Sequence, residues 1–184
     1  MLLQWDSVLA GAAAVLVAMD YRPRAEAASA YLEDYFLPKW EDTSSRCPAA
    51  PYSTVCYTPK GLAWYSEWGT LRNTGNAMFI AALMGKYSRN GATHMCWVRS
   101  QLRYITGAST DRSYLIGYGL NQPQRPHHRQ SACSAKYTEP CTPTDGGTCC
   151  VGESGAHALN TPLSLVDALQ LVGLDVTPGT TVTC

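Results

Sequence analysis

The chain has 184 residues, a mass of 20.0 kDa and a hydrophobic content of 46%, which suit one ordinary domain or one large piece of a bigger domain. Its 14 basic residues balance 14 acidic ones and no run of like charge occurs, so electrostatics gives no reason to expect nucleic acid or an anionic membrane as a partner. We therefore expect no nucleic acid, no membrane and an uncharged ligand.

Residues 1 to 19 predict a buried amphipathic helix rather than a signal peptide. No Lys or Arg precedes the apolar run, Trp5 and Asp6 stand where a basic segment belongs, and the run is short for crossing a bilayer. The apolar residues step by three and four, as on one helical face: Trp5, Val8, Leu9, Ala12, Val15, Leu16 and Met19. The parent protein is accordingly expected to begin upstream of Met1, where an export signal would lie.

Three further helices are expected before residue 107. They run from about Arg24 to Tyr35 with Pro23 at the first turn, from Trp68 to Tyr87, and through Met95 to Ile105. Their apolar stripes are, in turn, Ala28, Tyr31, Leu32 and Tyr35; Leu71, Gly75, Met78, Phe79, Ala82 and Leu83; and Met95, Val98, Leu102 and Ile105. Consecutive helices indicate helical hairpins, and no strand ladder is visible, so the predicted fold class is all-α.

Eight cysteines without a CxxC pair favour disulfides in an oxidising compartment over zinc. Cys47 and Cys56 bracket a loop within residues 41 to 60 closely enough for a disulfide to join them. The zinc alternative rests on cysteines that lie near His157: Cys133, Cys141, Cys149 and Cys150. Their spacing matches no standard finger, so neither a metal nor another cofactor is expected.

From Gly107 to Asn160 neither a helical nor a strand period persists, which predicts a long loop that is functional or cross-linked. A last helix is expected from Thr161 and Pro162. Its apolar residues are Leu165, Val166, Leu169 and Val172, and a polar tail follows to Cys184.

Residues 113 to 129 carry the most informative pattern of the chain. Gly117 and Gly119 allow a tight turn or a close approach to a ligand, and polar donors follow a tyrosine-rich stretch: Asn121, Arg125, His127, His128 and Arg129. Such a segment is typical of a polar cleft wall, and a solvated surface loop is the alternative. Tyrosines and tryptophans far outnumber the two phenylalanines, which suits sugar binding as well as ordinary half-buried surfaces.

The same segment resembles glycoside hydrolase family 9, whose members are chiefly endo-acting cellulases. The family signature reads Ser-Tyr-x-x-Gly-x-Gly-x-Asn-x-Pro-x-x-x-His-His-Arg, and residues 113 to 129 follow it with a small departure at Ile116. Further landmarks occur in the family's order: Trp5-Asp6, Tyr57 to Leu62, Trp68 to Arg72, Asn76 to Phe79, and Gln101 with Tyr104 and Ile105. The resemblance extends from residue 5 to about residue 135.

This resemblance implies a partial (α/α)6 barrel, the second half of a six-hairpin toroid with an open groove across one end. Residues 1–160 would form the C-terminal part of the catalytic domain, and residues 161–184 a divergent helix and tail. The family hydrolyses β-1,4-glucosidic bonds with inversion, using an aspartate base and a glutamic acid. The family's Asp-Ala-Gly-Asp type motif does not occur here, and Glu153 lacks the sequence context of the family's acid.

The family's active-site His-x-Arg matches His127 and Arg129, so the resemblance makes His127 the candidate catalytic residue and Arg129 a candidate substrate-binding residue. Trp68 and Tyr118 are candidates for stacking on a sugar ring, with packing in the core or at the rim as the alternative. Asn121, Arg72 and His128 are weaker candidates. The expected ligand is a β-1,4-glucan such as cellulose, bound by a secreted monomer.

Three functions remain open at this point. The chain could belong to an inverting endoglucanase that is active only with its missing half, it could hold glucan without cutting it, or it could be an incomplete product that does not fold stably, because half a toroid exposes apolar faces. Glucan affinity, turnover and folding of the isolated chain discriminate among them.

Overall fold

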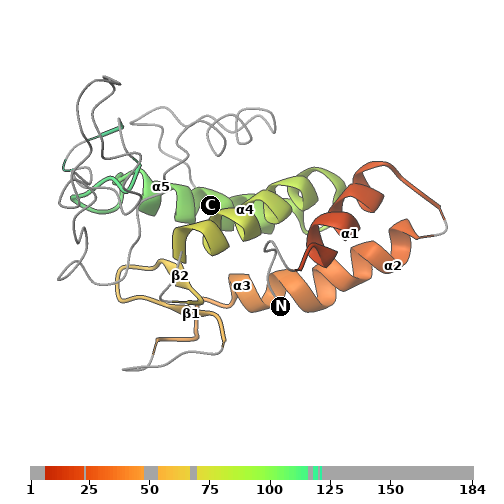
Figure 1. Ribbon diagram of the computed structural model, residues 1–184, viewed down its shortest axis with the longest axis horizontal. Helices are drawn as coiled ribbons and strands as arrows, with labels where there is room; N and C mark the ends of the chain where they lie inside the picture. Colours follow the sequence, from red (N-terminus) through yellow and green to blue (C-terminus); the bar gives the residue numbers. More distant parts are fainter. Residues whose placement is uncertain are drawn as a thin grey trace, which may run out of the picture.

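The computed structural model describes residues 7–22, 24–47, 54–66, 70–115, 118, 119 and 121, and within these residues helices dominate (Figure 1). The elements, in chain order, are α1 (Leu9–Ala18), α2 (Ala25–Ala30), a π-helical stretch η1 (Tyr31–Phe36), α3 (Leu37–Glu41), β1 (Cys56–Tyr57), β2 (Ala63–Trp64), α4 (Thr70–Tyr87) and α5 (Gly91–Ile105). The mostly helical class predicted from the sequence is confirmed. None of the helices in this part of the chain combines the length and hydropathy needed to cross a membrane.

The helical hairpin of α4 and α5 forms the centre of the described structure, and its existence was predicted correctly. The two helices lie side by side and antiparallel, joined by residues 88–90 (Figure 1). Of the predicted stripes, Leu71, Met78 and Ala82 are buried on α4, and Val98, Leu102 and Ile105 are buried on α5. Phe79 was expected to be buried but is 38% exposed.

Two glycines allow the backbones of α4 and α5 to touch near the turn that joins them. A Cβ built on Gly91 would lie 2.3 Å from the carbonyl oxygen of Gly85, which no real contact reaches. A Cβ on Gly85 would instead meet the side chain of Met95. The hairpin can therefore close this tightly only with glycine at position 91.

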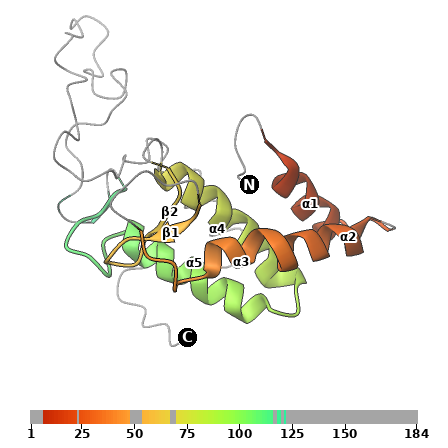
Figure 2. The ribbon, with the colours of Figure 1, turned by 90° about the horizontal axis from the view of Figure 1, so that it is seen from below.

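The helical segment that precedes the hairpin is longer than predicted. Helicity was expected to end at Tyr35, but the chain continues through η1 and α3 to Glu41, with Pro38 in the first turn of α3. Proline lacks the N–H that an α-helix needs, and the wider π-helical turn before it accommodates that loss, which explains the difference. The end of this segment, α3, packs against both α4 and α5 (Figure 2), while α2 and η1 pack on α1, and the segment buries Leu32, Phe36 and Trp40.

The predicted buried face of α1 is wrong, although the helix itself is present. Four large residues of that face are exposed, Val8 at 63%, Leu9 at 51%, Val15 at 50% and Met19 at 70%, and Leu16 is only partly buried. The helix instead buries the small residues Ala10, Ala13 and Ala14, which permit close packing on α2 and α4. Because α1 carries no charged residue, its periodicity could not identify the inner face, and the helix presents a second apolar face outward.

A short β-hairpin corrects the expectation that no strands occur. Cys56 pairs with Trp64 and Tyr57 with Ala63 in antiparallel register, within the loop that connects α3 to α4. Two-residue strands are too short to produce a readable alternation. The disulfide allowed by the sequence spacing, Cys47 to Cys56, is present with a Cα–Cα distance of 4.8 Å, so it closes the loop that enters β1.

Candidate functional site

Two connecting segments meet at one end of the α4–α5 hairpin, where α4 begins and α5 ends (Figure 1). One is the β1–β2 turn and the other is the chain that follows α5. The Lys60 ammonium lies 3.7 Å from an Asp111 carboxylate oxygen, and the side-chain amide of Asn121 donates a hydrogen bond of 2.8 Å to the Asp111 carbonyl. We call this end of the hairpin, with residues 58–64, 106–115, 118, 119 and 121, the loop end.

The chain reverses direction after α5 because of a glycine. Gly107 has φ of +85°, in the left-handed region that commonly terminates helices, and its N–H donates to the carbonyl of Tyr104. A Cβ on Gly107 would lie 2.9 Å from backbone atoms of Arg112 and Ser113. Two contacts fix the segment that follows this reversal against the end of α5. The Tyr114 N–H donates to the Ile105 carbonyl at 2.8 Å, and the rings of Tyr104 and Tyr114 stack with their centroids 5.7 Å apart.

The serine and a glycine of the Ser-Tyr-x-x-Gly-x-Gly pattern pack against each other. Ser113 is 1% exposed, and its hydroxyl is hydrogen-bonded to the backbone of Leu115. Gly119 has φ of +73°, and a Cβ there would approach the Ser113 Cβ to 3.1 Å. These two members of the pattern thus shape the backbone, and the polar residues after them are the candidates for ligand contact.

Tyr118, Asn121 and Arg72 are the predicted binding residues that the structure describes, and Tyr118 and Asn121 lie at the loop end. Tyr118 is half-buried, with its N–H donating to the Leu115 carbonyl at 3.2 Å. Asn121 is exposed, has φ of +51°, and uses its amide N–H group to hold the Asp111 carbonyl. Their contact with substrate stays a prediction. Arg72 is exposed in the first turn of α4, at the same end.

The remaining predictions about the site fall outside the described residues. They concern Trp68, His127, His128, Arg129 and Glu153, together with the alternative zinc ligands Cys133, Cys141, Cys149, Cys150 and His157. The long loop expected to Asn160 and the helix expected from Thr161 also lie there, apart from the first residues of the loop.

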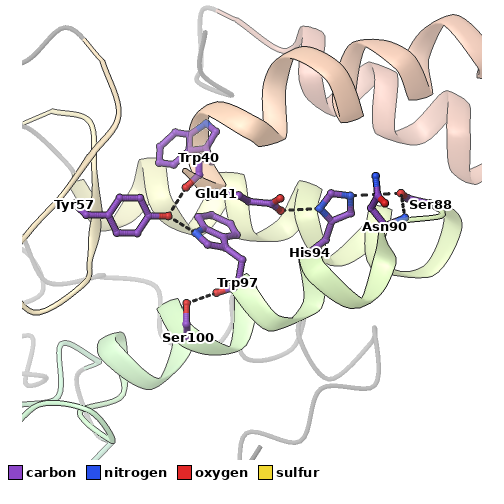
Figure 3. A network of polar contacts seen from close by, with 8 residues as sticks. All are labelled: Trp40, Glu41, Tyr57, Ser88, Asn90, His94, Trp97 and Ser100. Carbon is purple, nitrogen blue, oxygen red and sulfur yellow. Dashed lines mark hydrogen bonds and ion pairs between the residues drawn. The ribbon is translucent and has the colours of Figure 1, made fainter. Parts of the chain in front are cut away.

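Sequence reasoning missed a polar network inside the molecule (Figure 3). His94 Nδ1 lies 2.7 Å from a Glu41 carboxylate oxygen, with side chains only 4% and 14% exposed, and this pair joins α5 to the end of α3. The Trp97 indole N–H donates to the Tyr57 hydroxyl at 2.6 Å, and that hydroxyl donates to the Trp40 carbonyl. His94 and Glu41 are 53 residues apart in sequence, and Trp97 and Tyr57 are 40 residues apart. The one sequence signal for these contacts was a histidine on the buried face of α5.

This network is structural, and its tyrosine gives it a measurable pH dependence. Burial raises the pKa of Tyr57 to about 12, while the hydrogen bond from Trp97 opposes the shift. A folded-state pKa above the ordinary value of 10 stabilises the fold fully below pH 10. Between pH 10 and 12 the unfolded chain has lost the proton and the folded chain keeps it, so the free energy of unfolding falls as pH rises.

Tyr57→Phe is expected to lower the free energy of unfolding at pH 8 by about 2 kcal/mol, because the Trp97 N–H and the Trp40 carbonyl each lose a buried partner. The loss of stability from pH 8 to pH 11 should then be smaller in the variant by about 1 kcal/mol. Urea unfolding at the two pH values measures both effects. Equal alkaline losses in the two proteins would show that Tyr57 does not carry this pH dependence.

The sequence profile of glycosyl hydrolase family 9 matches residues 1–158 of the chain. The chain belongs to this family. Endoglucanase 4 of Bacillus sp. (strain KSM-522) is 38% identical over 79 residues, which cover 41% of this chain and 12% of that protein. Endoglucanase 24 of Oryza sativa subsp. japonica is 29% identical over 174 residues, covering 84% of this chain and 31% of that protein.

Solved structures show the same relationship. The endoglucanase of the termite Nasutitermes takasagoensis superposes with a TM-score of 0.59 and 27% identity, covering 75% of this chain and 28% of that one. Endoglucanase CelQ of Clostridium thermocellum, solved with cellobiose and cellotriose, superposes with a TM-score of 0.54 and 28% identity, covering 71% of this chain and 21% of that one. The family member described here therefore spans about a third or less of the length of the relatives it matches.

Proposed function

We propose that this chain is part of an inverting endo-β-1,4-glucanase and supplies one wall of its glucan-binding groove. The observation that carries the proposal is the family match over residues 1–158, because it includes the His-His-Arg signature that follows the described loop end. The complexes of the related CelQ with cellobiose and cellotriose support a β-1,4-glucan as the ligand.

In this proposal the helical hairpins are one part of a six-hairpin toroid, and residues 1–160 belong to its catalytic domain while residues 161–184 form a separate end. The groove crosses the loop end, where the segment of Tyr118 and Asn121 is fixed against the β1–β2 turn. His127 and Arg129 continue that segment and bind sugar hydroxyls beside the scissile bond. An imidazole and a fixed guanidinium suit this work because they donate directional hydrogen bonds to oxygen atoms.

The chemistry of the proposed reaction needs two carboxyl groups with distinct roles. One carboxylate removes a proton from water, which attacks the anomeric carbon, while a carboxylic acid on the opposite face protonates the leaving oxygen. The Asp-Ala-Gly-Asp type motif of the base is absent from the 184 residues, so we assign the base to a part of the catalytic domain outside them. His127 and Arg129 then orient substrate and water relative to that base.

The disulfide between Cys47 and Cys56 supports a secreted location, because such bonds persist in oxidising compartments. We further propose that the active protein is a monomer without a cofactor.

Two measurements on the isolated chain test this function: its binding of cellohexaose and its hydrolysis of a soluble cellulose derivative. Cellohexaose binding is expected in a calorimetric titration, and no reducing ends should be released from a soluble cellulose derivative, because the general base is not in these residues. Robust turnover would mean that the chain contains its own base. Absence of binding from a chain shown by circular dichroism to be folded would refute the proposed groove wall.

A further inference from the structure

Gln101 places a buried amide beneath the β1–β2 turn. It lies near the end of α5 and is 1% exposed. Its side-chain oxygen accepts the N–H of Ala63 at 2.8 Å, and its side-chain nitrogen donates to the carbonyl of Gly61 at 3.0 Å. A buried amide that satisfies both a donor and an acceptor of another segment fixes that segment in two directions, and no apolar side chain can do the same.

A second buried side chain holds the same turn from α4. Thr74 is 0% exposed, and its hydroxyl donates to the carbonyl of Ala63 at 2.7 Å, the nearer of two acceptors, since the carbonyl of Thr70 lies at 3.1 Å. The N–H and the carbonyl of Ala63 are thus bound by side chains from the two different helices of the hairpin. The turn therefore takes its position from the helical scaffold.

The outer side of the β1–β2 turn contacts the segment that contains the predicted binding residues Tyr118 and Asn121. Lys60 precedes Gly61 and pairs with the Asp111 carboxylate at 3.7 Å, and the Asp111 carbonyl holds the Asn121 amide at 2.8 Å. A continuous line of polar contacts runs from Gln101 through the turn to Asn121. The Lys60–Asp111 pair joins the turn to the segment after α5, and the Asn121–Asp111 hydrogen bond lies within that segment, so a shift of the turn acts on the segment through Asp111.

From these contacts we infer that Gln101 is a positioning residue for glucan binding, acting through the β1–β2 turn on the segment that contains Tyr118 and Asn121. Thr74 acts on the same turn from the other helix. This inference rests on the proposed function, since it names the residues that set the geometry of the proposed groove wall. Neither side chain is expected to touch the sugar, because both are buried.

The test compares variants that hold the turn, Gln101 on α5 and Thr74 on α4, with a control near the start of α5, for cellohexaose affinity and for thermal stability. Gln101→Met keeps the length of the side chain without its hydrogen bonds, and Thr74→Val keeps its shape. Both are expected to raise the dissociation constant at least tenfold at a temperature where circular dichroism is unchanged. The control, His94→Gln, breaks the buried pair with Glu41 near the start of α5 (Figure 3). It should lower the melting temperature but leave the dissociation constant within about twofold, since a purely structural loss should not reach the groove.

A surface variant keeps the test decisive if a buried variant fails to fold. Lys60→Met removes the exposed contact to Asp111 and should raise the dissociation constant about threefold. Unchanged affinity in the folded variants of Gln101, Thr74 and Lys60, or an equal loss in His94→Gln, would overturn the inference while leaving the proposed function intact. If the unchanged chain does not bind cellohexaose, the proposed function itself fails.

Discussion

Gly91→Ala is expected to lower the free energy of unfolding by about 3 kcal/mol, a large effect for one methyl group. The new Cβ would lie 2.3 Å from the carbonyl oxygen of Gly85 and 3.0 Å from its carbonyl carbon. Both are backbone atoms of α4, so they can move away only if the two helices separate. Separation would loosen the packing of the buried residues between them, and urea unfolding followed by circular dichroism measures the cost.

The matched control is the other glycine of the same crossing. A Cβ on Gly85 would meet the Sδ of Met95 at 2.5 Å and its Cγ at 2.6 Å, but a methionine side chain can change rotamer. Alanine also favours the helix over glycine by about 1 kcal/mol. Gly85→Ala should therefore change stability by less than about 1 kcal/mol. Equal destabilisation by the two substitutions would contradict the close backbone contact at Gly91.

Gly107→Ala is expected to cost about 3 kcal/mol as well and to weaken glucan binding. The residue has φ of +85°, and its Cβ would lie 2.9 Å from the carbonyl carbon and oxygen of Arg112 and the nitrogen of Ser113. The strain falls on the chain reversal that carries Tyr118 and Asn121 back to the loop end. Chemical unfolding and cellohexaose titration of the same preparation measure the two effects.

Gly61→Ala separates backbone strain from crowding. Gly61 also has a left-handed φ, +95°, but no atom beyond its two chain neighbours lies within 4 Å of the position of its Cβ. Its replacement should cost only the conformational term of about 1 kcal/mol. A Gly107 variant no less stable than the Gly61 variant would show that the chain reversal after α5 tolerates a side chain.

The buried face of a helix was predicted correctly from the sequence where polar residues mark the opposite face. Polar residues such as Arg99 and Arg103 fix the outer face of α5, and its inner residues Val98, Leu102 and Ile105 were identified correctly. On α1 there is no charged residue to mark the outer face, and the larger side chains were assigned to the inside although the alanines pack there. The helix expected to end at Tyr35 continues to Glu41, because the π-helical stretch η1 joins α2 to α3.

The site was predictable only as far as a local motif reaches. The pattern from Ser113 onward selected Tyr118 and Asn121, and the structure brings both to the loop end. The contacts that fix this end are long-range: Gln101 is 38 residues from Ala63. No periodicity or spacing rule links such residues, because their proximity depends on how the helices pack.

A calorimetric titration of cellohexaose into the unchanged chain and into His127→Ala, Arg129→Ala and Arg103→Ala tests the central claim most directly. Arg103 is exposed on α5 and serves as the control for a lost guanidinium. We expect binding by the unchanged chain and by Arg103→Ala, and an affinity at least tenfold lower in each of the other two variants. Binding that survives both the His127 and the Arg129 substitution, or is lost equally in Arg103→Ala, would contradict a glucan site built on the His-x-Arg pair.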